Sequence, residues 1–135
     1  MFRPMPFDKL RIFKVLKWGS DSDSPDWRDK VEEVESFDKA DIVTSQFRGT
    51  NSHQVVLDLD VPAALVPSST PGHSHLYIAS SMPWHTYSEL LDALANAGIL
   101  EPGYVGASKA RKFTAVRLPW VSKPVETFTD ILDAF

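Results

Sequence analysis

The chain has 135 residues, a length typical of one domain, and its 43% of hydrophobic residues is enough to build a folded core. The formal net charge of −4 excludes a surface coated in positive charge, so any contact with nucleic acid needs a local basic patch. Cysteine is absent, which excludes disulfides, thiolate nucleophiles and cysteine-bound zinc. Basic residues interrupt the apolar start of the chain, so we expect neither a signal peptide nor a membrane span, but one cytoplasmic domain over residues 1–135.

The first half of the chain reads as one ambiguous segment, one helix and three strands. Residues 9–18 fit either a helix with a basic face or an edge strand. After a loop over residues 19–26, apolar residues at helical spacing predict an amphipathic helix that ends near Phe37. The alternating segments 40–47 and 53–61 predict antiparallel strands joined by the turn "RGTN", and residues 75–80 predict a third strand.

The second half predicts two helices that flank a strand. Residues 83–98 form the clearest helix pattern, with a capping box at Thr86 and Glu89 and a stop at Gly98. Residues 112–120 alternate like a strand, and residues 125–135 have apolar side chains at helical spacing. If the first segment is a strand, the order β-α-β-β-β-α-β-α predicts an α+β fold, an antiparallel sheet with helices packed on one face.

Two acidic residues end the apolar run "VVLDLD". In a strand, Asp58 and Asp60 project from the same face, because side chains alternate. Two carboxylates on one face form half of a site for Mg²⁺ or Mn²⁺, which prefer oxygen ligands. The alternative is an antiparallel strand with one solvated face, on which acidic residues are common.

Two histidines stand two residues apart, ahead of the next apolar run. His75 lies at the entry of the predicted strand 75–80, and an imidazole there could reach a metal or phosphate near Asp58 if the two strands pair. We expect such neighbouring strands. His73 reads as a loop residue, although both histidines with the two carboxylates would also fit a metal-dependent phosphodiesterase or nuclease.

These motifs together resemble the archaeo-eukaryotic primase–polymerase superfamily. "VVLDLD" is similar to its first motif, "SSTPGHSHLYI" to its second with His75 in the histidine position, and "VRLPWVSK" to the segment that follows its third. The resemblance covers residues 55–123, about half of the chain, and implies an RRM-like or primase-like core. The whole sequence also resembles small proteins of mycobacteriophages and other actinobacterial phages, which implies action inside a bacterial host.

The superfamily resemblance implies roles for particular residues. Asp58 and Asp60 would be metal ligands and, with His75, the catalytic residues of a metal-dependent nucleotidyltransferase. The nucleotide-binding residues would be Ser69, His75, Lys109, Arg111 and Arg117. The third motif of the superfamily supplies another acidic residue, but no Asp or Glu lies between Glu101 and Glu126 here. Trp120 also stands where the superfamily has glycine, so we expect a reduced core.

The basic residues around the last predicted strand lead to the functional hypotheses. Lys109, Arg111, Lys112 and Arg117 could bind phosphates, and Tyr104 and Trp120 could stack on bases, or the charges could be solvated and the aromatics buried. The first hypothesis is a phage domain that binds nucleotide or nucleic acid with a divalent metal. The second is a protein without catalysis that binds a host bacterial protein, and the third is the metal-dependent nuclease.

Overall fold

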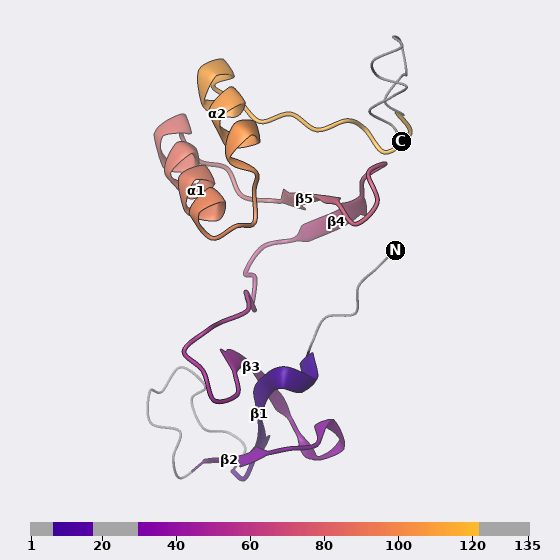
Figure 1. Ribbon diagram of the computed structural model, residues 1–135, viewed down its shortest axis with the longest axis vertical. Helices are drawn as coiled ribbons and strands as arrows, with labels where there is room; N and C mark the ends of the chain where they lie inside the picture. The colour runs from indigo at the N-terminus through magenta and orange to yellow at the C-terminus, as the bar shows by residue number, and fades with distance from the viewer. Residues whose placement is uncertain (1–6, 18–29, 122–135) are drawn as a thin grey trace. The chain divides into compact units, whose positions relative to one another are not determined.

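The computed structural model describes residues 7–17 and 30–121 and has an α+β fold (Figure 1), which confirms the predicted class. Its internal contacts divide the chain into two compact units. The first unit ends at Asp58 and the second begins at Leu59. Antiparallel strands occur in both units, and both α-helices belong to the second.

The first unit is a three-stranded antiparallel sheet in the order β2-β1-β3. β1 spans Leu10–Val15, β2 spans Val31–Val34 and β3 spans Ile42–Phe47. Short 3-10 turns, η1 at Phe7–Lys9 and η2 at Phe37–Lys39, precede β1 and β3. The strand alternative for residues 9–18 and the predicted strand at 40–47 are therefore confirmed.

The core of the first unit lies on one face of β1. Leu10 and Ile12 are completely buried there, whereas Arg11 and Phe13, which alternate with them, are only partly covered. The two faces of β1, the central strand, therefore differ: one carries the buried apolar residues and the other carries the polar contacts of Arg11.

The predicted helix ending near Phe37 is wrong where the structure describes it, because residues 31–34 form β2. Val31 and Val34 are three residues apart, a spacing typical of one helix face, but here they are the first and last residues of a four-residue strand. β2 pairs with β1 in a register that places Glu33 opposite Phe13. Pairing with a distant strand thus overrides the local periodicity.

In the second unit, β4 (Ala63–Pro67) and β5 (Ser74–Ile78) form an antiparallel hairpin. The hairpin turn contains Gly72 at φ 79°, a left-handed conformation that glycine adopts readily. β5 confirms the predicted strand at 75–80, but its partner differs from the prediction. Residues 53–61 form no strand, apart from a single bridge between His53 and Gln46.

Residues 53–61 are apolar, but they pair with no strand beyond the single bridge and their apolar side chains stay exposed. Val55, Leu57 and Leu59 are all exposed, so alternation buries neither face within this segment. β4 was missed by the sequence reading because it is short and begins with two alanines, which have low strand propensity.

Two helices follow the hairpin. α1 (Trp84–Asn96) confirms the predicted helix, and Gly98 at φ 78° follows its end as expected. The capping box is wrong: the N-cap is Pro83, and no side chain caps the helix. α2 (Pro102–Arg111) packs on α1 and was missed, because its two glycines lower helix propensity; Pro102 at its start was the available signal.

Residues 113–118 are irregular, so the predicted strand at 112–120 is wrong. Tyr87 Oη and Thr114 Oγ1 lie 2.7 Å apart, which ties this irregular segment to α1. The predicted helix at 125–135 lies outside the described residues. Among the residues that the structure describes, no helix is long and apolar enough to cross a membrane.

Candidate functional site

Asp58 and Asp60 lie in an exposed, irregular segment rather than at the end of a strand. Asp58 is the last residue of the first unit, and Asp60 is the second residue of the second unit. In the described ranges, no group of three His, Cys, Asp or Glu side chains could hold a metal ion. The pair therefore offers a cation two carboxylates, and the predicted metal site stays a prediction.

The β4–β5 hairpin carries the predicted second motif. Ser69 is exposed in the turn, and the backbone N–H of His73 closes this turn by donating to the carbonyl oxygen of Thr70 (3.1 Å). His75 lies on β5, and its register partner is Val66 on β4. The expectation that Asp58 and His75 lie on adjacent strands is wrong, because Asp58 belongs to no strand.

His75 has one unusual feature. Its Nδ1 atom is buried without a hydrogen-bond partner, although the residue as a whole is only partly covered. A buried ring nitrogen of this kind leaves a polar atom unsatisfied. Its predicted role in nucleotide binding stays a prediction.

Two of the predicted phosphate-binding residues already have partners on the helices. Lys109 Nζ donates to both carboxylate oxygens of Asp92 on α1, each at 2.9 Å. The Arg111 guanidinium lies over the Phe113 ring, 5.5 Å from its centroid. Both cations occupy the last turn of α2, where positive charge offsets the partial negative charge of the helix end.

The segment after α2 leaves two other cations accessible. Lys112 and Arg117 are exposed, and neither side chain makes a hydrogen bond or ion pair with another described residue. Phe113 and Trp120 alternate with them along the chain and are 56% and 77% exposed. We call residues 112–120 the basic–aromatic segment.

The backbone at Lys112 is unusual for a lysine. Its φ of 67° places it in the left-handed region, at the C-cap of α2. Glycine or asparagine is the usual residue in this conformation at a helix end, because a Cβ atom is crowded there. The chain therefore holds a strained cation where a glycine would be more stable.

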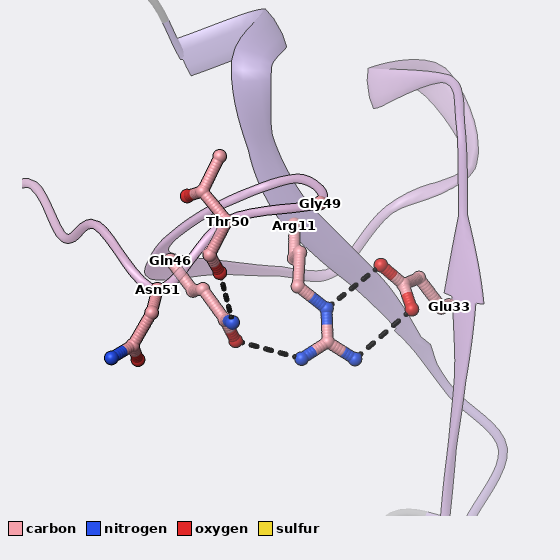
Figure 2. A pocket seen from close by; sticks show the side chains of 6 residues that line it. All are labelled: Arg11, Glu33, Gln46, Gly49, Thr50 and Asn51. Carbon is pink, nitrogen blue, oxygen red and sulfur yellow. Dashed lines mark hydrogen bonds and ion pairs between the residues drawn. The ribbon is translucent and has the colours of Figure 1, made fainter.

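A polar cluster on the first unit was not anticipated from the sequence (Figure 2). The Arg11 guanidinium donates to Glu33 through Nε (2.9 Å) and Nη2 (3.0 Å), and to Gln46 Oε1 through Nη1 (2.8 Å). Gln46 Nε2 donates in turn to the carbonyl oxygen of Thr50 (2.8 Å). These residues, with Gly49 and Asn51, line a shallow depression beside the β3 turn.

The cluster joins all three strands of the sheet, because Arg11 lies on β1, Glu33 on β2 and Gln46 on β3. The Arg11 hydrogen bond, together with its charge, lowers the pKa of Glu33, and the same pairing raises the pKa of Arg11. The sequence indicates this cluster only through "LRI". If the segment is a strand, Leu10 and Ile12 lie on one face and Arg11 lies on the other.

No family model, no curated protein and no solved structure matches this chain. The superfamily and phage resemblances described above therefore stay predictions.

The lowered pKa of Glu33 predicts how the stability of the first unit depends on pH. A carboxylate with a lowered pKa in the folded state stabilises above its unfolded pKa, near 4.5, and this contribution disappears as the pH falls through the folded pKa. We expect Glu33→Gln to be less stable than the wild type at pH 7, and the difference to shrink on acidification below about pH 4.5.

Denaturant unfolding at pH 7 and at successively lower pH values would measure this difference. Glu32→Gln is the matched control, because Glu32 neighbours Glu33 on β2 but forms no ion pair with a described residue. A Glu33→Gln difference that is constant with pH would contradict the prediction.

Proposed function

We propose that this chain is a phage-encoded, primase–polymerase-like protein that binds a nucleotide or a nucleic-acid strand in the cytoplasm of a bacterial host. The proposal concerns binding rather than catalysis, since the third acidic motif is missing from the sequence. The observation that carries it is the basic–aromatic segment, where cations and aromatic rings are interleaved and accessible.

The chemistry of the segment suits a single strand. Exposed Lys and Arg side chains attract phosphates, and aromatic rings provide surfaces on which unpaired bases stack. Lys112 and Arg117 carry the phosphate contacts in this proposal, because Lys109 and Arg111 are engaged by Asp92 and Phe113. The strained backbone at Lys112 also supports the proposal, because such strain often accompanies functional positions.

A titration with fluorescent oligothymidine at two salt concentrations tests this proposal. We expect the affinity of the wild type to fall as salt rises, because phosphate contacts release counterions. Arg117→Ala should weaken binding roughly tenfold at low salt and reduce the salt dependence, the effect of one lost charge-assisted contact. No measurable binding by the wild type at low salt would refute the proposal.

Lys112→Gly separates a loss of binding from a loss of folded structure. Glycine relieves the left-handed strain, so this variant should be more stable by about 1 kcal/mol in denaturant unfolding. It should nevertheless bind oligothymidine more weakly than the wild type. A stabilised variant with weaker binding cannot be explained by unfolding, whereas unchanged binding would remove Lys112 from the contact surface.

The proposal includes a Mg²⁺ or Mn²⁺ ion at Asp58 and Asp60, as the superfamily resemblance implies. Two exposed carboxylates supply two oxygen ligands and leave the other coordination positions to water or phosphate oxygens, an arrangement that Mg²⁺ accepts.

Substoichiometric Mn²⁺ would test this cation, because a bound paramagnetic ion broadens nearby NMR signals. We expect the amide signals of residues 57–61 to broaden in the wild type, and much less in Asp58→Asn and Asp60→Asn. Asp38→Asn, which changes an exposed acid in η2, should behave like the wild type. Equal broadening in all four proteins would exclude a specific site at this pair.

A second candidate function, binding of a host protein, rests on the β4–β5 hairpin. Leu65 and Leu76 are register partners on one face of the hairpin and are 64% and 60% exposed. Within the described residues, β4 and β5 pair only with each other, so each strand has a free edge. An isolated hairpin is marginal in water, and an extended segment of a partner protein could pair with an edge and cover the leucines.

A photoreactive residue in place of Leu76 tests this candidate in host extract. We expect one discrete adduct with a host protein, which Leu65→Lys in the same chain should reduce severalfold. The matched control places the photoreactive residue at Ala110, which is exposed on α2. The same adducts from both positions, or a product containing only copies of this chain, would refute binding of a host protein at the hairpin.

A further inference from the structure

The Arg11 cluster has unused donors. A guanidinium carries five N–H groups. Three of those on Arg11 bond to described residues, two to Glu33 and one to Gln46. The second N–H on Nη1 and the second N–H on Nη2 have no partner among the residues that the structure describes. In Figure 2, the two terminal nitrogens lie at the outer end of the Arg11 side chain, and none of the other drawn side chains lies beyond them. We call these two N–H groups the free edge of Arg11, and they are neighbouring donors.

The cluster also fixes the direction of these donors. Glu33 and Gln46 hold the guanidinium from two sides, and the planar group lies 5.2 Å from the centroid of the Phe13 ring. A long side chain that is already oriented loses little conformational freedom when a ligand binds. Arg11 is thus prepared to bind a planar group with two acceptors.

Charge decides which kind of acceptor pair fits. Arg11 and Glu33, the charged residues that line the depression, form an ion pair, and the charge of Arg48 also acts on Glu33. A carboxylate or phosphate at the free edge would be repelled by Glu33, whereas a neutral pair of acceptors would not. Among neutral groups, the N7 and O6 atoms of guanine present two acceptors at the spacing of an arginine fork.

We infer that the free edge of Arg11 binds the N7 and O6 atoms of a guanine base. This inference rests on the proposed nucleotide-binding function and gives it a base preference. Its site lies in the first unit and is built from residues other than those of the basic–aromatic segment. A ligand without guanine, such as oligothymidine, therefore tests the proposed function independently of the guanine site.

Four nucleotides with the same phosphate test the guanine site by NMR titration. GMP and IMP both offer N7 and O6, AMP replaces the O6 acceptor with an amino donor, and 7-deaza-GMP lacks N7. We expect GMP and IMP to shift the amide signals of residues 49–51 with similar affinity. AMP and 7-deaza-GMP should bind at least about fivefold more weakly.

Arg11→Lys keeps the charge and removes the fork, so it should abolish the preference for GMP over 7-deaza-GMP. Arg117→Lys makes the same exchange in the second unit and should leave the preference intact. The comparison of nucleotides on the wild type needs no variant, so it tests the guanine site even if Arg11→Lys does not fold.

Equal binding of all four nucleotides would overturn the guanine site and leave nucleotide binding standing. Competition by acetate at residues 49–51 would overturn it in favour of a carboxylate site.

Discussion

Pairing of β1 on both of its edges is the interaction on which the first unit depends. β2 and β3 do not pair with each other, so each is held in the sheet by its hydrogen bonds to β1. Among the described residues of this unit, Leu10 and Ile12 are the fully buried apolar ones, and both belong to β1. The Arg11 contacts add a side-chain connection between the same three strands on the opposite face. One strand thus supplies the backbone pairing, the core and the polar cluster.

The sequence predicts the elements whose pattern is local. α1 has a long apolar face, and β3 has β-branched residues in alternation, so periodicity is sufficient for both. It does not predict elements that become strands only through pairing with a partner strand. β2 becomes a strand through pairing with β1, and β4 becomes one through pairing with β5 across a tight turn. Residues 53–61 show the reverse case, because an apolar alternating segment without a partner strand does not form one.

The same distinction applies to the candidate sites. Asp58, Asp60 and His75 were grouped because they follow one another along the chain in a familiar order. The structure assigns Asp58 to the first unit and His75 to the second. The Arg11 cluster, by contrast, joins residues separated by 22 and 35 positions in the sequence. Such a cluster becomes visible only when the strand register is known, since Glu33 reaches Arg11 through the pairing of β2 with β1.

The ion pair between Lys109 and Asp92 has a thermodynamic consequence for the second unit. It connects α2 to α1, and the same ammonium group could serve a phosphate. A phosphate ligand bound to the Lys109 ammonium group would compete with the Asp92 carboxylate, and therefore with the contact between the helices. By linkage, the Lys109–Asp92 contact would weaken phosphate binding at Lys109 by the same free energy by which a bound phosphate weakens that contact.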